Sequence, residues 1–217
     1  MKFKTTPYHF DLLKDEERLS AFYEAIKELS TSQELAYDLG CGSGILSFFL
    51  NSYFKEIIAI EQDFKASRCA KENLKSFKNI EVVNEDVLKY DFSKKCDLIV
   101  CEMLDTALID EEEVPVLNHA RNYLKENGKI IPQGIINTIE LAHLERDYIH
   151  YDEINFLNDI NPDFEKVITI KANKDSLVNG LKITTITKLN DNLVCGPTPM
   201  LNPPLLIPLD EKIYHLR

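Results

Sequence analysis

Tyr37-Asp-Leu-Gly-Cys-Gly-Ser-Gly-Ile45 is the stretch that decides the fold of this chain. A short apolar run ends in the acid Asp38, glycines then alternate with other residues, and a second apolar run begins at Ile45. This order is typical of a first parallel strand, a tight glycine turn and the start of a helix. Because glycine has no Cβ atom, backbone N–H groups in such a turn come close to a ligand. The stretch therefore predicts an α/β fold with a ligand site at the end of its first strand.

The positions of the glycines and of the acid indicate which ligand the turn binds. A dinucleotide site requires a third small residue at position 45, but Ile45 is bulky and the third glycine comes one residue early, at Gly44. Asp38 would repel a pyrophosphate, whereas it can accept hydrogen bonds from an ammonium group. S-adenosylmethionine (SAM) combines adenosine with an ammonium and carries no phosphate. The stretch resembles motif I of the class I SAM-dependent methyltransferases; the alternative is a glycine turn of an unrelated α/β protein.

Length and composition indicate one soluble domain, or one domain with a small appendage. The chain has 217 residues, 44% of them hydrophobic and 28% charged, which is enough for a substantial core. No apolar run approaches the length of a membrane span, and no signal-peptide core follows the first residues. The five cysteines are odd in number and show no C-x-x-C spacing, which argues against a disulfide framework or a structural zinc site. Their pattern favours a reducing cytoplasm.

The charge of the chain bears on its partners. The formal net charge is −11, and the lysines are scattered rather than clustered. The negative electrostatic field of such a protein disfavours a nucleic-acid partner, although a local basic groove stays open as an alternative. The same field favours a basic protein or peptide as partner.

Residues Asp11 to Ser30 have apolar side chains at helical spacing and acids near the start, which predicts two short helices. We interpret these helices as a lid or flank beside the glycine turn. Arg18 lies in the middle of the segment. It is either a solvated helix arginine or a clamp on the carboxylate of the ligand.

Two further predicted strands are followed by acids. Ile57 to Ile60 is a continuous apolar run, as expected of a strand buried on both faces. Glu61 follows it, about twenty residues after the glycine turn, where α/β nucleotide folds place an acid that accepts both ribose hydroxyls. The alternative is a purely structural Glu61. After a third strand, Ile80 to Val83, we expect Asp86 to accept from an adenine amino group and Val87 to pack on the ring.

Two glutamates follow the fourth expected strand, Asp97 to Cys101. In this kind of fold the end of that strand faces the methyl group of the donor. The Asn/Asp-Pro-Pro-Tyr tetrapeptide, by which methylases of nucleobase and amide nitrogens hold their target, does not follow it. Glu102 is instead followed nine positions later by Glu111. Glu111 is either catalytic or one of the acids that the dipole favours at helix N-termini.

One more helix is expected before the chain changes character. It begins in the acidic turn Asp110 to Glu113, runs to about Lys125 and is closed by Asn127-Gly128. Lys129 to Pro132 then begins the next strand.

The rest of the chain predicts a smaller β-rich part. Asn137 to Leu144 alternates loosely, and Val167 to Ala172 and Leu181 to Leu189 look like antiparallel strands. The segment Gly196 to Pro208 is too rich in proline for a helix or an inner strand. We therefore expect a SAM-binding α/β domain with N-terminal helices over residues 1–133, and a small β-rich domain for substrate or dimerisation over residues 134–217.

Three local patterns resemble the protein arginine methyltransferases. His9 to Arg18 resembles the first helix of that family, with its Leu-Lys-Asp-x-x-Arg pattern. Glu102 to Arg121 resembles its double-glutamate hairpin, including the spacing of the two glutamates. Gly128 to Pro132 matches its Gly-x-Ile-x-Pro run into a β-rich domain, and the resemblance is nearly continuous from His9 to about Glu145. It implies a Rossmann-like class I methyltransferase fold with a small C-terminal β-rich extension.

The resemblance also implies roles for individual residues. Glu102 and Glu111 would hold a guanidinium in a fork-like grip, both ionised, and leave one nitrogen with more lone-pair character. That nitrogen would take the methyl group of SAM, with S-adenosylhomocysteine as product and no metal. The contacts expected to SAM come from Arg18, Asp38, Gly40, Cys41, Gly42, Glu61, Gln62, Asp86 and Val87.

The chain also departs from the pattern of that family. The family's N-terminal Tyr-Phe-x-x-Tyr element is unmatched, and Thr198 to Asn202 stands where the family has a Thr-His-Trp loop. Residues Arg146 to Val167 stand in for the family's dimerisation arm, which leaves a homodimer open. Arginine in a protein is the preferred methyl acceptor. A methyltransferase of RNA or of a small metabolite is the second hypothesis, and a non-catalytic SAM-binding subunit is the third.

Overall fold

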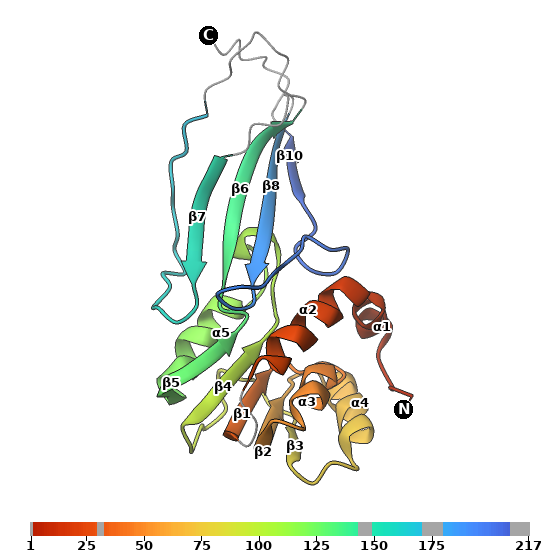
Figure 1. Ribbon diagram of the computed structural model, residues 1–217. Coiled ribbons are helices and arrows are strands. Elements are labelled where there is room, and N and C mark those ends of the chain that lie inside the picture. The colour runs from red at the N-terminus through yellow and green to blue at the C-terminus, as the bar shows by residue number, and fades with distance from the viewer. Residues whose placement is uncertain (1, 30–32, 143–148, 171–179, 209–217) are drawn as a thin grey trace.

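The computed structural model describes residues 2–29, 33–142, 149–170 and 180–208. A parallel sheet with helices around it forms one part, and an antiparallel sheet stands above it (Figure 1). The helices are α1 Pro7–Lys14, α2 Glu16–Lys27, α3 Ile45–Leu50, α4 Phe64–Leu74 and α5 Glu113–Ala120, with 3₁₀ turns η1 Thr106–Leu108 and η2 Arg121–Tyr123. The strands are β1 Gln33–Leu39, β2 Phe54–Ile60, β3 Ile80–Val83, β4 Cys96–Cys101, β5 Leu124–Ile131, β6 Gly134–Ala142, β7 Ile149–Asn155, β8 Gly180–Lys188, β9 Val194–Cys195 and β10 Leu205–Pro208.

The parallel sheet has the strand order β3-β2-β1-β4-β5. Its inner strands are buried on both faces, which explains the continuous apolar runs of β2 and β4. The chain adds β2 and β3 on one side of β1, and then β4 and β5 on the other. In open α/β sheets, ligands bind outside the carboxyl ends of the strands at such a reversal. The predicted α/β fold with a smaller β-rich part is confirmed.

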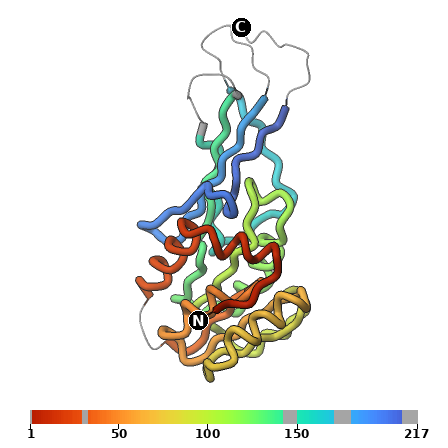
Figure 2. Tube along the Cα trace, turned by 90° about the vertical axis from the view of Figure 1, so that its right-hand side faces the viewer, coloured from red at the N-terminus to blue at the C-terminus, as the bar shows by residue number. Residues whose placement is uncertain are grey.

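Asp15 separates the two predicted N-terminal helices. Its carboxylate accepts the backbone N–H of Arg18 at 3.1 Å and so caps α2. The break turns α2 onto the parallel sheet, where Phe22 and Ile26 are fully buried. In both views the α2 helix lies between the parallel sheet and the C-terminal strands (Figures 1 and 2).

The helix after the two glutamates is shorter than predicted. α5 begins at Glu113 and ends at Ala120 rather than at about Lys125, and β5 already begins at Leu124. The pairing of β5 with β4 shifts register within the strand, and the extra residues around Asn127-Gly128 lie at this irregularity. The prediction that this pair closes the helix is therefore wrong.

The antiparallel sheet has the order β10-β8-β6-β7, and β9 pairs with β8. The proline-rich segment contributes only the edge strand β10, which agrees with its predicted exclusion from inner positions. The strand predicted over Val167 to Ala172 is wrong for residues 167–170, which form no strand. Val167 is 90% exposed, so its apolar side chain has no covered face to pack against. Residues 171 and 172 lie outside the described residues.

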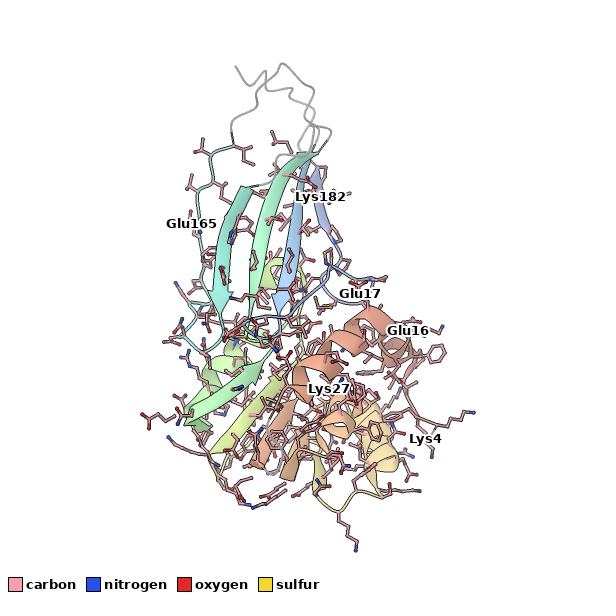
Figure 3. All side chains as sticks on the ribbon, viewed as in Figure 1. Lys4, Glu16, Glu17, Lys27, Glu165 and Lys182 are labelled. Carbon is pink, nitrogen blue, oxygen red and sulfur yellow. The ribbon has the colours of Figure 1, made fainter. Side chains whose placement is uncertain are left out.

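One apolar core continues from the parallel sheet into the base of the antiparallel sheet. It contains Ile99 of β4 together with Ile135, Phe156 and Leu201, all fully buried. Farther from this core, an ion pair joins the two inner strands of the antiparallel sheet, Lys182 of β8 with Glu140 of β6 at 2.7 Å; Figure 3 labels Lys182. Within the described part of the chain, no helix is long and apolar enough to cross a membrane.

The chain passes from the parallel sheet to the antiparallel sheet between β5 and β6, beside the boundary expected between residues 133 and 134. The shared core means that the two sheets are packed together, and the division into two domains stays a prediction. The dimerisation arm expected over Arg146 to Val167 also stays a prediction, and residues 146–148 lie outside the described residues.

Candidate active site

A cavity of about 160 Å³ lies at the carboxyl ends of the parallel strands. Its walls come from the residues that follow β1, β2, β3 and β4, from the N-terminal helices and from the C-terminal segment. Every predicted site residue other than Asp38 lines it: Arg18, Gly40, Cys41, Gly42, Glu61, Gln62, Asp86, Val87, Glu102 and Glu111.

The glycine turn forms a wall that side chains cannot occupy. Gly40 and Gly42 have φ angles of 69° and 54°, in the left-handed region that favours glycine. A Cβ atom on Gly40 would lie 2.8 Å from the side chain of Met103, and one on Gly42 would lie 2.6 Å from the ring of His9. The turn therefore has no room for side chains at these two positions, and the N–H groups of Gly40 and Cys41 both donate to the carbonyl oxygen of Ile60, at 2.9 and 3.0 Å.

Asp38 lies behind this turn rather than on the cavity wall. It is 1% exposed, and its carboxylate accepts a hydrogen bond from the Ser47 hydroxyl at 2.5 Å, which ties β1 to α3. Burial raises its pKa to about 6, although the Ser47 hydrogen bond opposes the shift. Its contact with the ammonium group of SAM stays a prediction.

Glu61 joins the ends of β1 and β2. One carboxylate oxygen accepts the N–H of Gly42 at 2.9 Å, and the other accepts the N–H of Asp63 at 2.7 Å. These bonds fix the orientation of a carboxylate that also lines the cavity. Glu61 thus has a structural role in the turn, and its contact with a ribose stays a prediction.

Asp86 and Val87 follow β3. The Asp86 carboxylate accepts the N–H of Leu88 at 2.9 Å and pairs with Lys89 at 2.7 Å. The hydrogen bond from Lys89 lowers the pKa of Asp86, so this carboxylate is ionised at neutral pH. Val87 is buried beside it and supplies an apolar surface.

Arg18 is buried, so the reading as a solvated helix arginine is wrong. Its guanidinium pairs with the Glu102 carboxylate and donates to the carbonyl oxygen of Leu12 at 3.4 Å. Its Nε atom is buried without a hydrogen-bond partner among the described residues. Burial raises the pKa of Glu102, and Arg18 opposes that shift by stabilising the charged form.

The loop between the two glutamates has an unusual backbone. Ala107 and Leu108 have φ angles of 64° and 57°, which cost non-glycine residues on the order of 1 kcal/mol or more each. The Asp105 carboxylate accepts N–H groups from Ile109 at 3.1 Å and from Asp110 at 3.0 Å, which stabilises the turn. The loop places Glu111 before α5, at the rim of the cavity.

Glu111 is exposed, and its carboxylate faces several other acids. Burial raises its pKa, and the negative charges of Asp105 and Glu102 raise it further. Because the helix begins at Glu113, Glu111 is not a first-turn residue of α5. It precedes the N-cap residue Glu112, and its role as a catalytic acid stays a prediction.

Glu113 is a buried acid that the sequence reading missed. It is fully buried, and one carboxylate oxygen accepts the N–H of Met103 at 2.9 Å and the thiol of Cys101 at 3.4 Å. Its other oxygen has no partner among the described residues, and burial raises its pKa to about 8. Its position at a helix start made it resemble an ordinary dipole-stabilised acid, so no sequence signal distinguished it.

The C-terminal segment closes one side of the cavity. The Thr198 hydroxyl and, at 3.0 Å, the Met200 N–H both donate to the carboxylate of Asp15. Met200 consequently lines the cavity, as do Tyr8 and His9 of α1. The same segment passes the start of α2, where Figure 3 labels Glu16 and Glu17. Sequence reasoning singled out this segment but did not bring it to the site.

A second cleft, of about 730 Å³, adjoins the first at Glu111, which lines both. It runs between the glutamate loop and α5 on one side and β7 with the following segment on the other. Its acids Asp152 and Glu153 are paired with lysines at 3.3 and 2.6 Å, and Tyr151 and Phe164 add aromatic surface. The lining residues include four acids and no lysine or arginine. This cleft was not predicted.

Known proteins similar to this chain place it in a family. The family described as methyltransferase domain matches residues 36–128. An uncharacterized protein of Methanothermobacter thermautotrophicus is 46% identical over 97% of this chain and 89% of that protein. A ribosomal protein L11 methyltransferase of Thermoanaerobacter pseudethanolicus is 32% identical over 53% of this chain and 36% of its own length. A histone-arginine methyltransferase of Drosophila persimilis is 29% identical over 68% of this chain and 28% of its own length.

A solved structure has a similar fold over most of this chain. The chain from the Trypanosoma brucei PRMT1 enzyme–prozyme heterotetrameric complex with AdoHcy superposes with a TM-score of 0.78, over 94% of this chain and 82% of that one. The two chains are 16% identical, so the likeness concerns the fold. Taken with the glycine turn and the cavity, these similarities show that the chain belongs to the class I SAM-dependent methyltransferases, in a form that resembles the protein arginine methyltransferases.

Proposed function

We propose that this enzyme transfers the methyl group of SAM to a guanidinium nitrogen of an arginine in a protein or peptide. The observation that carries the proposal is the position of Glu102 and Glu111 on the same cavity as the glycine turn and Glu61. Binding of SAM itself would not require Glu102 and Glu111 in addition to Glu61. Two carboxylates at the end of β4 are suited to a planar cation with several N–H donors.

The residues of the cavity would divide their work between cofactor and acceptor. The backbone of residues 40–42 and the side chains of Glu61, Asp86 and Val87 would hold the adenosine part of SAM. Bound SAM supplies a methyl group on a positively charged sulfur. Among the described residues, the Arg18 Nε donor has no partner, so Arg18 could bind the SAM carboxylate through Nε while its terminal nitrogen orients Glu102.

Glu102 and Glu111 would orient the acceptor. Charge-assisted hydrogen bonds from both carboxylates localise the guanidinium charge on one side and leave one nitrogen free to attack. Holding that nitrogen in line with the methyl group supplies much of the rate gain. The nitrogen gains the methyl group and loses one proton. The raised pKa of Glu111, at the open rim of the cavity, suits it to accept that proton.

The second cleft supports a protein or peptide as the acceptor. It adjoins the catalytic cavity at Glu111 and combines acids with exposed apolar side chains such as Ile109 and Phe164. Asp152, Glu153 and Asp159 pair with Lys166, Lys188 and Arg121, so attraction of a basic segment would rest on Glu111. Two relatives of this chain carry the names of protein methyltransferases, which favours the same class of acceptor.

The remaining expectations concern the whole molecule. We expect a homodimer, because the resembling family has a dimerisation arm and the solved relative is described as a heterotetrameric complex. The cysteine pattern keeps the reducing cytoplasm as the expected compartment. The β-rich residues 134–217 are proposed to serve the substrate or dimerisation.

Transfer of a labelled methyl group tests the proposal. The purified enzyme is incubated with methyl-labelled SAM and a cell extract, with protease or nuclease added in parallel and small molecules separated by filtration. Label in protein that is released on hydrolysis as methylarginine supports the proposal. Label in another amino acid refutes the guanidinium grip, and label in RNA or a small molecule refutes a protein acceptor. Without label in any fraction, measured SAM binding would support a non-catalytic subunit.

A further inference from the structure

The loop from Glu102 to Glu111 forms hydrogen bonds with the β-rich part of the chain. At its tip, the Ala107 N–H donates to the Thr185 hydroxyl of β8 at 2.8 Å. Next to it, the Thr106 hydroxyl donates to the carbonyl oxygen of Pro203 at 2.5 Å. Both partners come from the β-rich part of the chain.

We propose that Thr185 and Asn137 are positioning residues for methyl transfer, which hold the loop from Glu102 to Glu111 in the shape that brings both glutamates to one cavity. This inference rests on the proposed roles of Glu102 and Glu111. Neither Thr185 nor Asn137 lines that cavity. Both would act through the loop backbone, and Asn137 also lines the second cleft.

The loop needs such support because of its backbone conformation. Ala107 and Leu108 have positive φ angles of 64° and 57° without being glycine. Conformations of this kind persist only where surrounding contacts enforce them. The bonds from Asp105 lie within the loop, so they shape it without fixing its position relative to the sheet.

The Thr185 hydroxyl is oriented for this contact. Thr185 and Asn137 are direct partners across β8 and β6, and both are buried. The hydroxyl donates its single proton to Asn137 Oδ1 at 2.6 Å, which leaves its oxygen lone pairs for the Ala107 N–H. Removal of the hydroxyl would leave the Ala107 N–H and Asn137 Oδ1 without their partners.

Two substitutions of one residue test the inference. Thr185→Val keeps the shape of the side chain without the hydroxyl, and Thr185→Ser keeps the hydroxyl. We expect the valine variant to lose about tenfold to hundredfold in kcat through misplacement of the loop. We expect the serine variant to restore kcat to within about threefold, and the Kd for SAM to stay within about threefold in both.

A control and a second readout separate positioning from general damage. Thr138→Val removes another hydroxyl of the same antiparallel sheet, one that donates to the Thr184 carbonyl oxygen at 3.2 Å, and should leave kcat unchanged. Hydrogen–deuterium exchange over residues 102–111 should become faster in Thr185→Val and not in Thr185→Ser or Thr138→Val. Equal exchange in all variants would overturn the inference, as would wild-type kcat in Thr185→Val.

The exchange measurement also distinguishes failure of this inference from failure of the proposed function. Exchange depends on the loop and not on the identity of the acceptor. If the wild-type enzyme does not methylate arginine, faster exchange in Thr185→Val still supports the loop contact and removes only its link to that reaction. If arginine is methylated and the valine variant has wild-type kcat, the proposed function stands and the positioning role is refuted.

Discussion

Replacement of Glu113 by glutamine should make the stability of the enzyme less dependent on pH. Glu113 is fully buried, and burial raises its pKa from 4.5 to about 8. Between these two values the folded protein holds a proton on this side chain that the unfolded chain has released. Stability from this group is therefore complete below pH 4.5 and is lost as the pH rises toward 8.

The size of the effect follows from the shift. Each pH unit within this window removes about 1.4 kcal/mol from the free energy of unfolding, because one proton separates the two states. Between pH 6 and pH 8 the wild-type enzyme should thus lose about 2–3 kcal/mol through Glu113. Glutamine keeps an oxygen acceptor for the Met103 N–H but does not titrate, so this loss should disappear in the variant.

Urea unfolding at pH 6, 7 and 8 measures the difference. The wild-type and Glu113→Gln proteins are compared at each pH, since the contributions of other titrating groups, such as His9, cancel in the comparison. The free energy of unfolding of the wild type should fall relative to the variant at each step. Parallel pH profiles for the two proteins would refute the assignment of a raised pKa to Glu113.

Three further predictions concern the cavity. Glu102→Gln should lower kcat by about hundredfold or more, because the negative charge that binds the acceptor guanidinium is lost, while the Kd for SAM should stay within about threefold. An equally large loss of SAM affinity, measured by calorimetry, would contradict this role. Glu61→Ala should weaken SAM binding by about tenfold to hundredfold, because the carboxylate proposed to bind the ribose also accepts the Gly42 N–H. An unchanged SAM affinity, measured by calorimetry, would contradict this prediction. Gly40→Ala should cost about 1–2 kcal/mol of stability at a positive φ beside Met103, measured by urea unfolding, and an unchanged midpoint would show that the turn relaxes freely.

Much of the parallel half of the fold could be predicted from local sequence. β2 and β4 are buried on both faces, so each appears as an unbroken apolar run that few other structures produce. The end of α5 could not be predicted, because Asn127-Gly128 has the composition of a helix cap and lies instead where β5 shifts register against β4. The shift depends on a partner strand more than twenty residues earlier, which local patterns do not report.

Some residues of the candidate site could be predicted from the sequence and others could not. Glu61 and Glu102 directly follow strands, and the ends of parallel strands meet at one edge, so sequence position alone predicted that they share a cavity. Met200 is held at the cavity by Asp15, and Thr185 contacts the glutamate loop at Ala107; both partners are remote in the sequence. Such contacts arise from packing between distant parts of the chain, so no local sequence motif predicted them.

The bond between Asp15 and the segment around Met200 has a consequence for the synthesis of the chain. A nascent chain that has emerged through β8 already contains the glycine turn and both glutamates. It still lacks Met200, one wall of the cavity, and its Asp15 carboxylate has only the start of α2 to cap. On the ribosome the glycine turn is therefore synthesised early, whereas the wall of the cavity is completed only after residue 200 has been translated.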